Sequence, residues 1–140
     1  MANLTITAAS VAKGSNATVV SYTAGGTLTQ GMPVYIDTSN NAIAARANAA
    51  ATDGVVGITL NAASSGQPVS VLTSGDITIG ATVAVGTVYC LAYATGAGLI
   101  CPNADIQAQT GGVAYVTVLG VATSATVIAV NISVSSVAIP

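Results

Sequence analysis

The chain has 140 residues, and six of them are charged. These six are Lys13, Asp37, Arg46, Asp53, Asp76 and Asp105. The length is typical of one domain, since most domains hold about 100–150 residues. Two cations cannot neutralise a run of phosphates or form a polybasic patch on a lipid surface, so we expect neither nucleic acid nor a membrane as a partner.

The composition indicates an all-β fold. Val, Thr and Ile supply 48 residues, Leu and Met supply nine, and the chain has no Glu, His, Trp or Phe. β-Branched side chains suit the pleated, half-buried surface of a sheet, whereas straight-chain helix formers are scarce. Short apolar runs between Gly-rich turns therefore predict an antiparallel β-sandwich or β-barrel, jelly-roll-like in type, with an extended N-terminal arm.

The chain divides at a glycine pair. Residues 1–24 are polar and poor in Gly, and Gly25 and Gly26 follow them. We expect this first segment to be either an ordinary edge strand or an arm that docks on a neighbouring subunit. Residues 25–140 are predicted to form a single β-rich domain.

Eight strands are predicted from runs of β-branched residues that lie between turn signals. They cover residues 4–8, 18–22, 33–37, 54–60, 68–73, 87–93, 113–121 and 126–132. Turns are predicted at residues 25–26, 39–41, 66–68, 74–76, 95–98, 102–103 and 111–112. The Ala-rich residues 41–52 fit a turn or two of helix, a flexible loop or a continuation of the preceding hairpin.

The last two predicted strands form an antiparallel hairpin around residues 122–125. Alternation places Ile128, Val130 and Ile132 on one apolar face, which we expect to point into the core. Gly57 and Gly120 each interrupt an apolar strand. A glycine in such a place marks a bulge or a close approach of two backbones.

One uncharged stretch resembles a membrane helix in hydropathy alone. Residues 77–100 contain four Gly and four Thr and have no flanking cations, so no spanning helix is predicted. The N-terminus has no basic segment followed by an apolar stretch, so we expect no secretory signal.

Catalysis lacks its usual side chains. Without His or Glu, acid–base chemistry would fall to four Asp, one Lys, five Tyr and two Cys, and no GxSxG or GxxxxGK[ST] pattern occurs. The triplet that begins at Asp37, Asp-Thr-Ser, lacks the Gly of the aspartic-protease motif and has no second copy. We therefore predict no enzyme activity, no catalytic or metal-binding residues and no cofactor.

Two smaller features have a structural interpretation. Asp37, Asn40 and Asn41 offer oxygen ligands for Ca²⁺, but the spacing lacks the Gly and distant Glu of a calcium loop, which favours an Asx turn. Cys90 and Cys101 flank the predicted turn at residues 95–98. A cross-hairpin disulfide is possible there, and two buried, reduced thiols are the favoured interpretation.

The scarcity of charge predicts assembly. Charged side chains are one of the ways in which natural proteins protect the edges of their sheets, and a soluble monomer normally carries several times more charge than this chain. Neutral faces and open edges are buried when a subunit packs against identical copies or a larger lattice.

An ordered series of turn-and-strand phrases covers about residues 25–132. The phrases are GMPVYID (31–37), GVVGI (54–58), ASSGQPVSV (63–71), GTVY (86–89), TGAG (95–98) with Pro102 shortly after, and VLGVA (118–122). This order resembles the small β-rich head decoration, or cement, proteins of tailed bacteriophages. Similar modules also occur in phage head fibres and tail-associated proteins.

The resemblance implies a β-barrel or sandwich subunit, commonly a homotrimer, on the outer capsid surface of a virion. Such a subunit binds the major capsid protein and stabilises the shell by clamping adjacent subunits. The phrases carry no catalytic residues. The alternative that we keep is a head-fibre or tail-associated module that binds a host-surface glycan, with Tyr89, Tyr93 and Tyr115 as candidate contacts, although tyrosines in alternating strands more often belong to the core.

Overall fold

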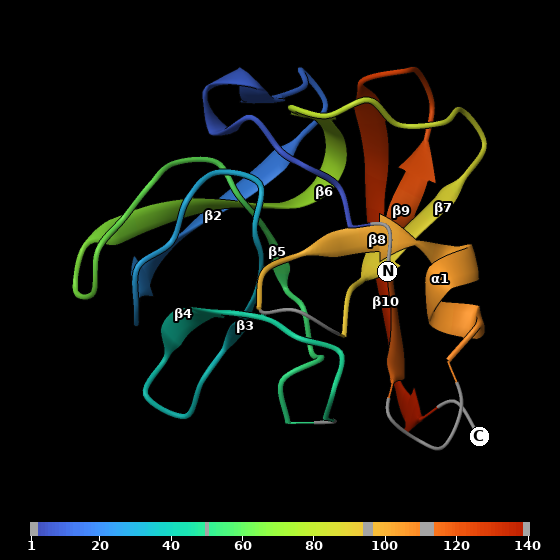
Figure 1. The fold of residues 1–140 in the computed structure, drawn as a ribbon. Helices are drawn as coiled ribbons and strands as arrows, with labels where there is room; N and C mark the ends of the chain where they lie inside the picture. The colour runs from blue at the N-terminus through green and yellow to red at the C-terminus, as the bar shows by residue number, and fades with distance from the viewer. Residues whose placement is uncertain (1–2, 50, 94–96, 110–113, 139–140) are drawn as a thin grey trace.

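The computed structural model describes residues 3–49, 51–93, 97–109 and 114–138 (Figure 1). Its strands are β1 (Val11–Lys13), β2 (Thr18–Ala24), β3 (Pro33–Ile36), β4 (Asn41–Ala44), β5 (Gly57–Thr59), β6 (Pro68–Ile79), β7 (Val88–Leu91), β8 (Ile100–Pro102), β9 (Tyr115–Ala122) and β10 (Val127–Ala138). A single 3₁₀ turn, η1 (Ala8–Ser10), and one short helix, α1 (Asn103–Gln107), complete the elements of the described residues. The all-β prediction is confirmed.

The long strand β6 connects two parts of one sheet. Its first half pairs with β2 on one side and β5 on the other, and its second half pairs with β1 and β10. Pairings β2–β4, β4–β3, β3–β5, β5–β6 and β6–β2 close a five-stranded circuit. From the second half of β6, the sheet extends through the neighbouring strands β10, β9, β7 and β8. Figure 1 shows β6 arching from β2 towards β10.

Among the described strands, every pair but one is antiparallel. β2 and β4 run parallel, with Thr23 opposite Asn41 and Ala24 opposite Ala42. The expectation of a purely antiparallel sheet is therefore wrong at this pair. The β3–β4 hairpin returns β4 alongside the end of β2, and this short parallel contact closes the circuit.

The buried side chains form three clusters. Ala, Val and one Leu fill the five-stranded circuit: Ala24, Leu28, Val34, Ala42, Ala63, Val69 and Val71. The main core lies largely against the second half of β6 and its neighbours. It contains Tyr89, and its largest fully buried members are Ile58, Leu72, Ile77, Ile79, Leu91, Ile100, Leu119 and Ile128. Cys90, Ala92, Cys101 and Ile106 of α1 form the third. Apart from Leu28, the fully buried side chains of the circuit are Ala and Val, so a chain without Phe or Trp can fill it.

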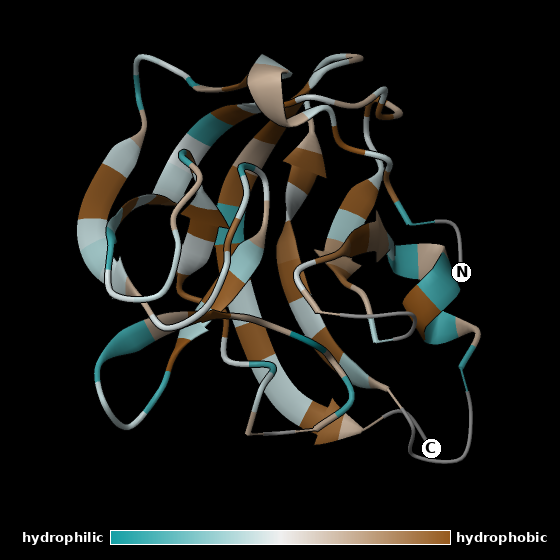
Figure 2. Ribbon diagram, turned by 60° about the vertical axis from the view of Figure 1, so that its left-hand side comes forward, coloured by the Kyte–Doolittle hydropathy of each residue, from teal (hydrophilic) through white to brown (hydrophobic). Residues whose placement is uncertain are grey.

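A bulge in β6 divides its side chains between two cores. Val71 packs inside the circuit and Ile77 in the main core, although strict alternation would put both on one face. Adjacent residues of β2 pair with Leu72 and Ser74, so Thr73 is an extra residue in β6. One extra residue inverts which side chains face inward. Figure 2 shows the alternation of apolar and polar residues as brown and pale bands along the strands.

Several predicted strands are confirmed with small changes of length. β2, β3, β7 and β9 lie within or close to their predicted ranges, and β6 and β10 run further than predicted. Ile128 and Val130 are buried and Ile132 packs against the main core, as the alternation indicates. For residues 41–52, the hairpin interpretation is right for β4, and the described residues that follow it, 45–49 and 51–52, contain turns and no helix.

Residues 4–8 form no strand, contrary to the prediction. The Leu4 amide donates to the Ile100 carbonyl and the Thr7 amide donates to the Gly80 carbonyl, both at 2.8 Å. These two bonds reach different segments, so they cannot extend into a ladder. The 3₁₀ turn η1 follows, and β1 and β2 then join the sheet on β6.

The predicted turn at residues 74–76 is also wrong, because these residues lie inside β6. Gly75 has φ +97°, and a Cβ atom there would lie 2.7 Å from the Cα of Ala17. The glycine thus lets β6 pass close beneath the segment that joins β1 to β2. Strands β1 and β8 and helix α1 are not among the predicted elements; α1 begins where a turn is predicted at residues 102–103. The predicted turn positions at residues 95, 96, 111 and 112 lie outside the described residues.

The two strand glycines mark close backbone approaches, as predicted. A Cβ atom on Gly57 would collide with the Leu72 carbonyl oxygen, and one on Gly120 with the Ala129 carbonyl oxygen. Between β7 and β9, the pairing also shifts next to Gly120.

We predict that Gly120→Ala destabilises the protein by about 3 kcal/mol, since the methyl group meets backbone that cannot move without breaking the β9–β10 ladder. Gly26→Ala is the matched control. Nothing lies within 4 Å of its Cβ position, so we expect unchanged stability or a gain of up to about 1 kcal/mol. Urea denaturation of both variants measures the difference, and equal midpoints would contradict the close approach.

Candidate functional site

The residues that sequence reasoning considered for chemistry do not meet in one site. Across the described ranges, no three Cys, His, Asp or Glu side chains gather as a metal site requires. Asp37 Oδ1 accepts the amides of Ser39 and Asn41, both at 2.9 Å. This geometry confirms the Asx turn.

The three candidate tyrosines are also separate. Tyr89 is 3% exposed in the main core, and its hydroxyl accepts the amide of Ala84 at 3.0 Å. Tyr93 and Tyr115 are half-buried on other segments, and the Tyr93 carbonyl accepts Arg46 Nε. The core interpretation is confirmed for Tyr89, which has too little exposed surface to stack on a sugar.

Cys90 and Cys101 are directly opposite each other on β7 and β8. Both are free and fully buried, and the Cys90 thiol donates to Asn103 Oδ1 at 3.4 Å. Burial raises the pKa of Cys90 to about 11 and that of Cys101 to about 12. The favoured prediction of two buried, reduced thiols agrees with this arrangement.

Asp53 is a buried carboxylate next to the end of β10. Its side chain is 0% exposed, Oδ1 accepts the Ser136 hydroxyl at 3.2 Å, and its carbonyl accepts the Thr117 hydroxyl at 2.8 Å. No group in the described part of the chain bonds Oδ2. Burial raises the pKa of Asp53, and the hydrogen bond from Ser136 partly opposes that rise.

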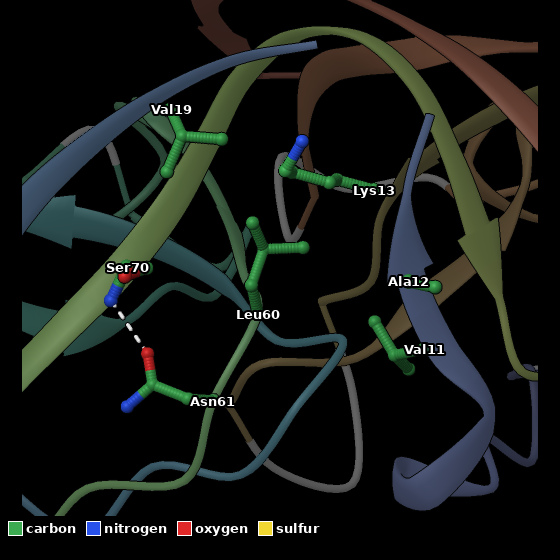
Figure 3. Close-up of a pocket in the computed structure, with 7 residues that line it drawn as sticks. All are labelled: Val11, Ala12, Lys13, Val19, Leu60, Asn61 and Ser70. Atoms are coloured by element: carbon green, nitrogen blue, oxygen red, sulfur yellow. Dashed lines mark hydrogen bonds between the residues drawn. The ribbon is translucent and has the colours of Figure 1, made fainter. Parts of the chain in front are cut away.

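An open crevice lies where β6 bends (Figure 3). It has a volume of about 360 Å³, within the range of ligand-binding clefts. Its walls come from four segments: β1, β2, β6 and the residues after β5. We call it the β1–β2 crevice, and its lining residues are Val11, Ala12, Lys13, Val19, Leu60, Asn61 and Ser70.

One wall of the crevice is held by hydrogen bonds. Asn61 Oδ1 accepts the amide of Ser70 at 2.6 Å, and Asn61 Nδ2 donates to the carbonyls of Ala62 and Pro68 at 3.0 and 3.3 Å. These bonds fix the residues that follow β5 against β6. The amide of Asn61 is therefore occupied by the chain itself and forms a wall.

The opposite wall carries the charge. Figure 3 shows Lys13 between β1 and the Leu60 side chain. Among the described residues, none forms an ion pair with the Lys13 ammonium group. The other cation, Arg46, donates to the Tyr93 carbonyl. The crevice thus places one positive charge, that of Lys13, beside apolar lining side chains such as Leu60.

The crevice borders a free strand edge. On the side away from β6, no described strand pairs with residues 18–22 of β2. Val19 and Val20 are 38% and 39% exposed there, and this edge has no charged residue or Pro. Val19 belongs to both the edge and the crevice.

The far end of β10 is a second open edge, but it is irregular. The pairing with β9 shifts between Val134 and Ala138, and Ser136 has φ +53°. Ser135 donates its hydroxyl to the Val116 carbonyl. Bulges of this kind protect sheet edges from pairing, so β2 is the more regular template.

Sequence reasoning missed this site, because no local pattern joins residues 11–13, 19, 60–61 and 70. The available signal was compositional: Lys13 is one of two cations in the chain.

No family model matches the chain, and no curated protein sequence matches it. Of the helices in the described residues, none is long and apolar enough to cross a membrane.

We predict that stability depends on pH through Asp53. Its carboxyl binds a proton more tightly when native, so its contribution to the free energy of unfolding is greatest at low pH and falls as pH rises through the native pKa. Asp53→Asn removes the buried charge, so its stability should fall less between pH 4 and pH 7 than that of the wild type. Denaturation at both pH values tests this, with Asp37→Asn, in a surface turn, as control. Parallel profiles for Asp53→Asn and wild type would refute it.

We also predict that neither thiol reacts in the native protein. Both are buried, and their raised pKa values leave almost no thiolate at pH 8. DTNB should label no thiol in minutes under native conditions and two in urea. Rapid labelling of one thiol in the native state would show that the third cluster is open.

Proposed function

We propose that the chain is a structural virion protein that binds the outer surface of a phage capsid and stabilises the shell by clamping adjacent major capsid subunits. The observation that carries this proposal is the free, uncharged edge of β2 in a chain with six charged residues. An open edge is a template for pairing with another chain. The order of turn-and-strand phrases supports the phage decoration class.

The proposed action is mechanical, without an enzymatic step. Contacts that exist only on the assembled shell add binding free energy to that state alone, about 2.7 kcal/mol per site at a free concentration 100 times Kd. A homotrimer would engage several subunits at once, and linked contacts bind more tightly than each alone. Weak contacts at each subunit boundary would then resist separation of the shell.

The glycan-binding alternative has less support. A sugar platform needs an exposed aromatic face, and Tyr89 is buried while Tyr93 and Tyr115 are half-buried on different segments. A glycan array probed with the purified protein distinguishes this function from capsid decoration.

We predict that particles of the encoding virus that lack this protein release their DNA at a lower temperature than complete particles. Adding the purified protein back should restore the release temperature at a saturating ratio near one copy per major capsid subunit, or one trimer per local symmetry axis. Dye access to DNA during heating measures release, and co-sedimentation measures the ratio. A handful of bound copies would indicate a fibre or tail component, and equal release temperatures would contradict the cement role.

A further inference from the structure

We infer that the free edge of β2 and the β1–β2 crevice together bind an extended, acidic segment of the major capsid subunit. This inference rests on the proposed function and names the surface and the chemistry of its partner. The segment would add as a strand to β2, place an apolar side chain in the crevice and bring a carboxylate to Lys13.

Residues 18–22 of β2 have backbone groups on one side that no described strand pairs with. In an antiparallel pair, successive residues point their amides and carbonyls alternately towards and away from the partner strand. β6 satisfies one side of residues 18–22, and no described strand satisfies the other. An extended chain is the partner that pairs with such a row, and alternate side chains then reach pockets beside the edge.

The crevice supplies the side-chain chemistry. Val11, Val19 and Leu60 form apolar walls that suit an aliphatic side chain. Lys13 lies beside them with no ion pair among the described residues, and its complement is a carboxylate. Because Val19 lies on both the edge and the crevice wall, one strand can use both.

A second copy of this chain is a poor source of that segment. Its four side-chain carboxylates are all placed in folded elements, and none lies in a free extended strand. Asp37 holds its Asx turn, Asp53 is buried, Asp76 lies within β6 with a neighbour on each side, and Asp105 lies in α1. A different chain, the major capsid subunit in the proposed function, must therefore supply the acidic residue.

The test measures binding to shells that lack the protein. Co-sedimentation titrations compare wild type, Lys13→Glu, Lys13→Arg and Val85→Glu. Val85 is 68% exposed in the loop between β6 and β7, so its variant controls for an added negative charge elsewhere. We expect Lys13→Glu to weaken binding about tenfold, because it replaces attraction with repulsion, and the other two to stay within about twofold.

Hydrogen exchange tests the strand addition separately. Shell binding should slow exchange in peptides that cover residues 18–22 and leave those from the β6–β7 loop unchanged, since added backbone bonds protect amides. Equal binding by all four proteins with no protection of β2 overturns the inference and leaves the cement role intact. Protection of β2 in the free protein, together with concentration-dependent sedimentation, assigns the edge to a second copy and also overturns it. No binding by wild type overturns both.

Discussion

The twelve residues of β6 pair along both sides, and this double pairing holds the two halves of the molecule together. One side meets β2 and then β1, and the other meets β5 and then β10. Two departures from regular strand geometry make this possible. The extra residue Thr73 redirects the side chains from one core to the other, and Gly75 removes the Cβ that would strike Ala17. The β1–β2 crevice is the space left inside that bend, so its shape depends on the same strand.

The core is built mainly from aliphatic side chains, and few polar or charged groups are buried in it. Ala and Val supply most of the five-stranded circuit, and β-branched residues supply most of the main core, in which Tyr89 is the one buried aromatic side chain among the described residues. Its one buried carboxylate, Asp53, has a single side-chain hydrogen bond, from Ser136. Burial without full pairing is costly for a charge, which makes this corner of the structure a local weakness. Because the chain has so few charged residues, β2 also lacks the charged side chains that normally prevent a sheet edge from pairing with another chain.

Features that depend on neighbouring residues in the sequence were predicted correctly. Alternation identified the inward face of β10, and the glycines in apolar runs identified the close approaches at Gly57 and Gly120. Long-range contacts decided the rest. The neighbours Ser74 and Asp76 make Gly75 look like a turn residue in the sequence. In the structure, its positive φ instead allows β6 to bend. The parallel β2–β4 contact and the crevice join segments distant in sequence, so no window of residues contains them.

Specificity in such a chain must come from few groups. Backbone pairing at an edge recognises any extended partner, and a net charge of −2 gives little long-range steering. In the proposed complex, the Lys13 ammonium group is then the main feature of the apolar crevice that distinguishes one extended partner from another. A segment without an acidic residue leaves Lys13 unpaired beside apolar surface, and a basic segment meets repulsion. Scarcity of charge thus gives Lys13 its discriminating value: with Arg46 bound to the Tyr93 carbonyl, no other described cation competes with it for an incoming carboxylate.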